Sequence, residues 1–439
     1  MAQENPTTAT GTITLPKKED TSISKNSLGP IFIIGILFFI FGFVTWTNSI
    51  LIPYLKIACE LNYTEAYFVT TAFYIAYLIM GVPSAMLLKK TGFKNGMSIG
   101  LLIIAVGAVI FIPAALTRQY AVFLGGLFIQ GTGLAVLQTA SNPYITIVGP
   151  LESAAKRISI MGICNKAAGA LAPIILGSIM LKDADALDAR VKTMNSVDKA
   201  NELDTLAHQV IVPYLVIMAV LILLAIFIYF THLPEIEAEG GDTSQSDSNS
   251  KTSIFQFPHL MMGVLALFVY VGVEVIAGDS IVSYGKSLGV SLTISKFFTA
   301  CTMGSMVVGY IIGIICIPKY FKQDKALTVS AVLGVIFSIM ALITHGYASI
   351  ACIALLGLAN ALMWPALWPL SIKGLGSFTK TGSALLVMGI AGAAVIPPLY
   401  GTLAQKWGTH DAYVILLPCY VIIGYFSIWG HNLKARTAK

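Results

Sequence analysis

Charged side chains interrupt two long apolar stretches of this sequence. Lys166 follows Asn165 in one stretch, and Glu274 and Asp279 stand five residues apart in another. A charged group at the centre of a bilayer costs at least about 2.5–3.5 kcal/mol, so such residues usually line a water-filled path or pair with one another. A buried carboxyl group can take up a proton, and carboxylate oxygens also coordinate small cations such as Na⁺. The pattern predicts ion binding in the second stretch and an acidic partner for Lys166.

Amide and aromatic side chains extend this set toward a sugar site. Sugar hydroxyls need amide and carboxylate partners, whereas the C–H face of a sugar ring packs on a flat aromatic ring. The substrate-binding residues that we expect are Asn48, Gln138, Asn142, Asn165, Lys166, Glu274, Asp279, Trp364 and Trp368, of which Asp279 and Glu274 are also expected to bind a coupling ion. Tyr74, Tyr77 and Tyr270 are further candidates. The alternatives stay open, because buried amides also join helices to each other and aromatic residues also gather at membrane interfaces.

The spacing of the two carboxylates bears on how they act. On a straight α-helix, residues five apart point about 140° away from each other. Glu274 and Asp279 therefore have different roles unless the helix is broken at Gly278, which lies between them. Aligning Ser280-Ile281 with Ser49-Ile50 places Asp279 opposite Asn48, which favours Asp279 as the carboxylate at the middle of the membrane.

Long apolar helices must position these side chains. The chain has 439 residues, of which 56% are hydrophobic and 11% charged, whereas soluble domains carry roughly a quarter charged residues. A membrane helix needs about 20 mostly apolar residues. Twelve such spans are predicted at 30–56, 66–88, 95–117, 120–149, 157–181, 209–231, 259–285, 294–317, 326–345, 347–373, 381–405 and 411–432. The predicted fold class is an all-α polytopic membrane protein.

Charge and polarity divide the chain further. Residues 1–28 are expected to be a disordered cytoplasmic tail, 29–231 a first six-helix bundle, 232–258 a cytoplasmic linker, 259–432 a second bundle and 433–439 a second tail. Lys and Arg are concentrated in the loops on the side of both chain ends, which the positive-inside rule places in the cytoplasm. The net charge of +6 is spread over these short loops without forming a basic face, so it does not indicate nucleic-acid binding.

An internal repeat relates the two predicted bundles. The segment from Arg157 to Gly169 has a counterpart from Lys380 to Gly392, with twelve positions from the basic residue to the glycine in both. Upstream, Asn142-Pro143 parallels Trp368-Pro369. Two like-oriented halves of six helices, with the solute site between them near the midplane, form the major facilitator architecture.

Motifs for other chemistry are weak or missing in the sequence. Gly96-Met97-Ser98-Ile99-Gly100 matches the nucleophile pattern G-x-S-x-G, but it opens a membrane helix instead of a strand-to-helix turn. A Walker A motif, an HExxH motif and a paired CxxC motif do not occur, so we expect neither an enzyme nor a bound metal or organic cofactor. The expected partners are a sugar, the lipid bilayer and H⁺ or Na⁺, and the expected state is a monomer.

Several sequence runs are typical of one known family. They are Asn48-Ser49-Ile50-Leu51-Ile52-Pro53, Gly133-Leu134-Ala135-Val136-Leu137-Gln138-Thr139-Ala140-Ser141-Asn142-Pro143, Tyr270-Val271-Gly272 and Ser371-Ile372-Lys373-Gly374-Leu375-Gly376. With them the chain resembles, over nearly its whole length, the L-fucose permease group of the major facilitator superfamily, the fucose/glucose/galactose symporters. The resemblance implies alternating access around a central hexose site, driven by protons or sodium, in the inner membrane of bacteria.

The chain departs from the fucose permease pattern at two acidic positions. Ser49 stands where that permease carries an Asp, and Gln138 stands where it carries a Glu. Both acids are linked to proton coupling there, whereas the positions that match Glu274 and Asp279 are uncharged in it. Our hypothesis is that coupling has moved to the seventh helix and that the substrate is glucose, galactose or N-acetylglucosamine. The alternatives are an uncoupled sugar facilitator and an L-fucose-type proton symporter.

Overall fold

The structure is a computed structural model that describes residues 28–147, 154–182, 184–191, 193–231, 253–317, 320, 322–375 and 378–433. The two expected tails and most of the expected linker lie outside the described residues. All regular elements within these ranges are helical. This outcome follows from the apolar composition, because a helix satisfies every backbone N–H and C=O within its own segment where lipid offers no partners.

The first part of the chain, up to residue 231, contains nine α-helices among its described residues. They are α1 (Leu28–Trp46), α2 (Asn48–Ala58), α3 (Tyr63–Ala66), α4 (Phe68–Thr117), α5 (Tyr120–Ile147), α6 (Ala154–Met180), α7 (Ala184–Val191), α8 (Ser196–His208) and α9 (Ile211–Phe230).

The second part follows from residue 253. Its α-helices are α10 (Pro258–Val275), α11 (Ile281–Ser287), α12 (Leu292–Cys316), α13 (Gln323–Ile343), α14 (Tyr347–Asn360), α15 (Met363–Ile372), α16 (Thr379–Gly389), α17 (Gly392–Trp407) and α18 (Leu416–Ile428). A π-helical segment, η4 (Ile276–Ser280), joins α10 to α11. Short 3₁₀ turns are η3 (Ile254–Gln256), η6 (Asp411–Ile415) and η7 (Gly430–Asn432).

The described residues contain 11 helical segments that are long and apolar enough to cross a membrane. One of them, Tyr63–Thr117, has 55 residues and is far longer than one crossing requires. Gly92 divides it, because its φ of 75° lies in the left-handed region that favours glycine. Lys89, Lys90 and Lys94 flank this kink, as expected where a chain turns back at the bilayer surface. Counted as two crossings, this segment brings the total to the twelve spans predicted from the sequence.

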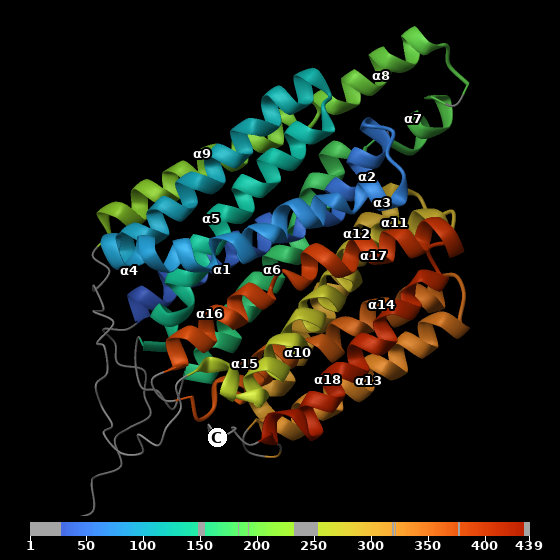
Figure 1. Ribbon diagram of the computed structural model, residues 1–439. Coiled ribbons are helices and arrows are strands. Elements are labelled where there is room, and N and C mark those ends of the chain that lie inside the picture. The colour runs from blue at the N-terminus through green and yellow to red at the C-terminus, as the bar shows by residue number, and fades with distance from the viewer. Residues whose placement is uncertain are drawn as a thin grey trace, which may run out of the picture.

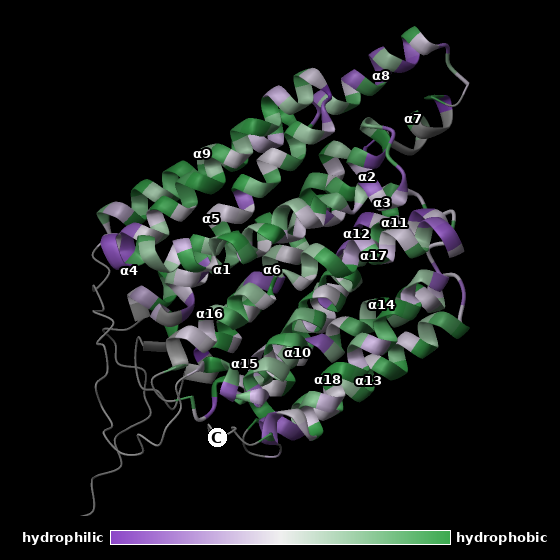
Figure 2. Ribbon diagram, viewed as in Figure 1, coloured by the Kyte–Doolittle hydropathy of each residue, from purple (hydrophilic) through white to green (hydrophobic). Residues whose placement is uncertain are grey.

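The helices form two groups that lie side by side (Figure 1). Helices α1, α4, α5, α6 and α9 pack mainly against one another, and so do α10 and the helices that follow it. The two groups meet where α6 runs along α12 and where α4 packs against α16 and α17. Hydrophobic residues cover most of the helices, and hydrophilic residues are more frequent toward their ends (Figure 2). We call the membrane side that holds both ends of the described chain the terminal face, and the opposite side the distal face.

The first and seventh spans are both interrupted at equivalent positions. Thr47 separates α1 from α2, and η4 separates α10 from α11. Ser49 donates a hydrogen bond to the Trp46 carbonyl at 2.8 Å, and Ser280 donates one to the Ile276 carbonyl at 2.6 Å. Serine hydroxyls that bond back to their own helix in this way often accompany bends. The interruptions therefore coincide with the Ser49 and Ser280 positions that the sequence repeat aligns.

Candidate transport site

An ion pair joins the two helix groups. The Nζ of Lys166 in α6 lies 2.5 Å from Oε1 of Glu274 in α10, and the two side chains are only 8% and 10% exposed. The same Nζ lies 4.5 Å from the ring centre of Trp46. Breaking a buried pair leaves an uncompensated charge, which is strongly destabilising. The acidic partner expected for Lys166 is thus confirmed, and it comes from the other half of the chain.

Asp279 lies close to this pair, but no described residue forms a hydrogen bond with it. It sits in η4, its side chain is fully buried, and neither carboxylate oxygen has a partner within the described ranges. Lys166 attracts its charge and Glu274 repels it. A buried polar group without a partner costs free energy, and a buried charge costs far more. The position therefore suits a carboxyl group that is protonated or that binds a cation.

The π-helical segment changes the relation between the two carboxylates. The hydrogen bonds of a π-helix join residues five apart, so it brings such residues closer to one face than a straight α-helix does. Glu274 precedes η4 and Asp279 lies within it, and both interact with Lys166. The helix is thus widened around Gly278 instead of broken there.

The four expected amides occupy different surroundings. Gln138 in α5 donates to the Tyr77 hydroxyl at 2.8 Å. Asn165 accepts a hydrogen bond from Trp46 Nε1 and donates one to the Phe38 carbonyl, both at 3.4 Å. Asn48 has a buried amide oxygen and a buried amide nitrogen that find no hydrogen-bond partner in the described part of the chain. Asn142 is half-buried, about one helical turn beyond Gln138 on α5. Gln138 and Asn165 therefore also fit a structural role, whereas Asn48 has unused hydrogen-bonding capacity.

Two tryptophans form an aromatic surface beside the ion pair. The Trp364 and Trp368 rings in α15 stack at 5.6 Å between centres. Trp364 also lies 6.5 Å from the ring of Tyr270, which is buried in α10 and whose hydroxyl interacts with Glu274. This arrangement places Trp364 toward the site and away from the lipid surface.

Other residues of the cluster were not singled out from the sequence. Tyr310 in α12 and Tyr420 in α18 both lie within electrostatic range of Glu274. The Tyr420 hydroxyl donates to Oδ1 of Asn360 at 2.9 Å, and the buried Nδ2 of Asn360 has no hydrogen-bond partner among the residues that the structure describes. Asn360 is an amide inside an apolar stretch, so the criterion that selected Gln138 also applies to it.

Hydrogen bonds between the two halves close the distal face. Thr71 donates to the Ala394 carbonyl at 2.7 Å, and Lys296 donates to the Ser178 hydroxyl at 2.7 Å. The Tyr67 and Tyr400 rings meet edge to face at 5.4 Å. These contacts lie between the site and the distal face. The structure is therefore in a conformation that is sealed on this side.

Fold and site together define a class of protein, a polytopic helical carrier with two like halves and a polar site at their boundary. Residues 34–377 match the Major Facilitator Superfamily, and the chain belongs to that superfamily. The family resemblance and the fold class predicted from the sequence are both confirmed.

Curated relatives extend this result. The chain is 34% identical over 418 residues to a glucose/galactose transporter of Brucella abortus biovar 1 (strain 9-941), a match that covers 94% of this chain and 97% of that protein. It is 29% identical over 430 residues to the L-fucose-proton symporter of Escherichia coli (strain K12), which covers 96% of each. The crystal structure of the superfamily transporter FucP in the outward conformation superposes with a TM-score of 0.71 at 28% identity, covering 92% of this chain and 99% of that one. The chain is thus a multi-pass membrane transporter, while the roles of the individual site residues stay predictions.

Proposed function

We propose that this protein carries a hexose such as glucose, galactose or N-acetylglucosamine across the bacterial inner membrane by alternating access, in symport with a cation. The observation that carries the proposal is the buried Lys166–Glu274 pair, which joins the two halves amid amide and aromatic side chains. Relatives of nearly equal length are named for glucose, galactose and fucose transport. The lysines of the terminal face favour a cytoplasmic location for it by the positive-inside rule. One chain supplies both halves, so a monomer suffices.

The sugar is proposed to bind between the ion pair and the aromatic surface. A pyranose ring packs its C–H face on Trp364 and Trp368, and its hydroxyls bond to Gln138, Asn48 and neighbouring amides. The hydroxyls also bond to Lys166 and Glu274, which keep hydrogen-bonding capacity beyond their single mutual contact. Sugar binding therefore draws on both halves at once, which favours the conformation in which they are close.

Asp279 is proposed to bind the driving cation, either H⁺ or Na⁺, with Glu274 as the second coupling carboxylate. In the distally closed conformation Asp279 is buried and has no hydrogen-bond partner among the described residues. Such a conformation is costly with a bare carboxylate and much less so with a bound cation. A bound cation thus shifts the equilibrium toward closure by its differential affinity for the closed state. Without the cation, closure around the sugar is unfavourable, and this dependence couples sugar transport to cation transport.

Uptake by purified protein in proteoliposomes tests the proposal. We expect a panel of hexoses to show concentrative uptake driven by a pH gradient or a Na⁺ gradient. Asp279→Asn is expected to abolish accumulation while exchange of sugar across the membrane continues, because a neutral amide imitates the loaded carboxyl. Accumulation that is unchanged in both Asp279→Asn and Glu274→Gln overturns the coupling role of the seventh span.

An uncoupled facilitator is the second candidate, and the uncharged residues Ser49 and Gln138 favour it. Both replace acids that the resemblance links to proton coupling. A facilitator would equilibrate sugar across the membrane without accumulating it under either gradient. The proteoliposome experiment therefore separates the two candidates directly.

A further inference from the structure

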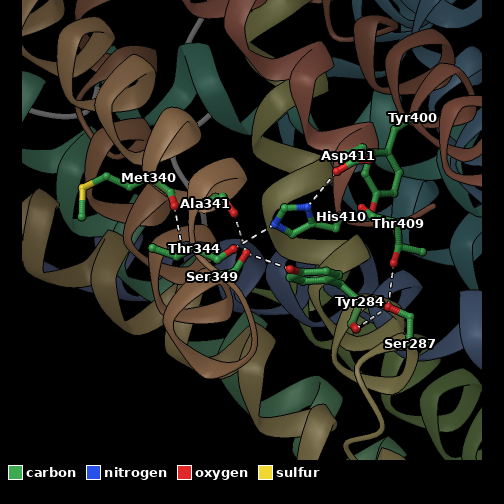
Figure 3. Close-up of polar contacts among 10 residues, drawn as sticks. All are labelled: Tyr284, Ser287, Met340, Ala341, Thr344, Ser349, Tyr400, Thr409, His410 and Asp411. Carbon is green, nitrogen blue, oxygen red and sulfur yellow. Dashed lines mark hydrogen bonds and ion pairs between the residues drawn. The ribbon is translucent and has the colours of Figure 1, made fainter. Parts of the chain in front are cut away.

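A histidine on the distal face connects two helix ends outside the membrane spans. His410 lies between α17 and η6, with a side chain that is 19% exposed. Its Nδ1 lies 2.9 Å from Oδ1 of Asp411, and its Nε2 lies 2.9 Å from the carbonyl oxygen of Thr344 at the end of α13 (Figure 3). We call His410, Asp411 and the Thr344 carbonyl the His410 clamp.

Both partners of the imidazole are hydrogen-bond acceptors. A backbone carbonyl has no proton to give, and an ionised carboxylate only accepts. The Asp411 side chain is 67% exposed. Neutral imidazole carries one N–H and therefore satisfies only one of these contacts, leaving a lone pair facing an oxygen at the other. The geometry thus favours the imidazolium, which carries a proton on each ring nitrogen.

The other titratable groups around His410 are few within the described residues. The ring centre of His345, an exposed residue between α13 and α14, lies 4.9 Å from the ring centre of His410. The ring centre of Tyr284 in α11 lies 6.2 Å from it. Burial lowers the pKa of His410, but the hydrogen bonds to Asp411 and Thr344 and the charge of Asp411 outweigh it. The pKa of His410 is therefore raised above its usual 6.5.

The residue before His410 ties further helices to the same point. Thr409 shares a hydrogen bond of 2.6 Å with Ser287 at the distal end of α11, and its carbonyl accepts one of 3.0 Å from Tyr400 of α17 (Figure 3). Tyr284, one turn earlier in α11, donates to Ser349 of α14 at 2.8 Å. Helix α11 directly follows the segment that holds Asp279. Residues 409 and 410 are therefore linked by a hydrogen bond to the distal half of the seventh span.

We propose that His410 is a proton-binding site on the distal face, and that its protonation fastens the distal end of α11 to α13, α14 and α17. The pH on that side then governs how readily the distal face opens, independently of the cation at Asp279. The direction of the pH dependence follows from linkage, because the folded protein binds this proton more tightly than the unfolded chain does. The stabilisation by the clamp is complete below pH 6.5 and is lost as the pH rises through the raised pKa.

Nitrogen-15 NMR tests the proton site. The sample is full-length protein in lipid nanodiscs, with nitrogen-15 in the histidine rings. The His410→Gln spectrum identifies the His410 signals. We expect both ring nitrogens of His410 to remain protonated above pH 6.5, and Asp411→Asn to move the titration midpoint to lower pH. A neutral His410 ring at pH 6, or a midpoint that Asp411→Asn leaves unchanged, overturns the proposal.

Hydrogen–deuterium exchange of residues 281–289 and 344–350 tests the fastening role. In the wild type, exchange corrected for intrinsic rates is expected to accelerate as the pH rises through the NMR midpoint. His410→Gln is expected to exchange fast at every pH, and His345→Gln, which alters only the neighbouring ring, is expected to follow the wild type. Identical pH profiles for the wild type and His410→Gln contradict fastening. Neither measurement involves sugar, so a failed transport assay leaves this inference unaffected, and the reverse also holds.

Discussion

Lys166 and Glu274 hold each other at 2.5 Å although they are 108 residues apart and belong to different halves of the chain. Either substitution alone, Lys166→Met or Glu274→Gln, leaves one buried charge without its partner, for which we expect a loss of about 3–5 kcal/mol in the free energy of unfolding. The double variant removes both charges and is expected to lose less than the sum of the single losses. Denaturant or thermal unfolding of the four proteins in detergent measures this coupling. If the loss in the double variant equals the sum of the two single losses, the two charges do not stabilise each other.

Gln138→Ala is expected to remove stabilisation by sugar while the fold persists. A ligand that binds only the folded state raises the apparent stability by RT ln(1 + c/Kd), where c is the free ligand concentration, so weaker binding gives a smaller rise. The Gln138 side chain bonds to Tyr77 near the cluster, so its loss weakens sugar binding and removes little packing. Thermal shifts with and without hexose measure the effect.

Gln130→Ala provides the matched control for this experiment. It makes the same change on the same helix, about two turns away, where the side chain interacts with Tyr214 of α9. We expect the sugar-dependent shift to survive in this variant. Equal shifts in the two variants would exclude Gln138 from the sugar site.

Thr71→Val is expected to loosen the distal closure. The substitution keeps the shape of the side chain and removes the hydrogen bond to the Ala394 carbonyl in the other half. A single such bond contributes about 1 kcal/mol, which corresponds to roughly a fivefold shift toward the distally open state. Spin labels at Thr64 and Thr402, which face each other across the halves, report this population by distance measurement. Thr117→Val on the same helix loses only a bond within α4, to Pro113, and should leave the distances unchanged.

The sequence predicted much of this fold because the bilayer restricts the possible structures. Twelve spans, two like halves and an acidic partner for Lys166 follow from hydropathy, from the repeat and from the cost of a buried charge. The identity of that partner did not follow. Glu274 and Asp279 were both available, and only the packing of α6 against the second half selects Glu274.

The irregular segments could not be predicted from periodicity. The π-helical turn at η4 is stabilised by side chains of another helix, since Thr299 of α12 donates to the Gly278 carbonyl at 2.8 Å. Such a contact joins residues 21 positions apart, and hydrophobic spacing contains no signal for it. Asn360 differs, because its position as an amide in an apolar stretch is a signal in the sequence, and only its partner Tyr420, 60 residues away, is not. The site therefore depends on tertiary contacts at the points where the helices are not regular.

Gly278→Ala tests whether η4 must lie directly against the first span. A Cβ atom at this position would overlap the six-membered ring of Trp46, which is itself buried between the halves. We expect overpacking to cost about 1–3 kcal/mol and to move the indole, which thermal unfolding and Trp fluorescence detect. Trp46→Phe removes the overlapping atoms, so the double variant should recover part of the loss. Gly304→Ala in α12 has open space around the new methyl and should be neutral or slightly stabilising. A Gly278→Ala protein as stable as this control would show that the close contact between the two interrupted spans is not required.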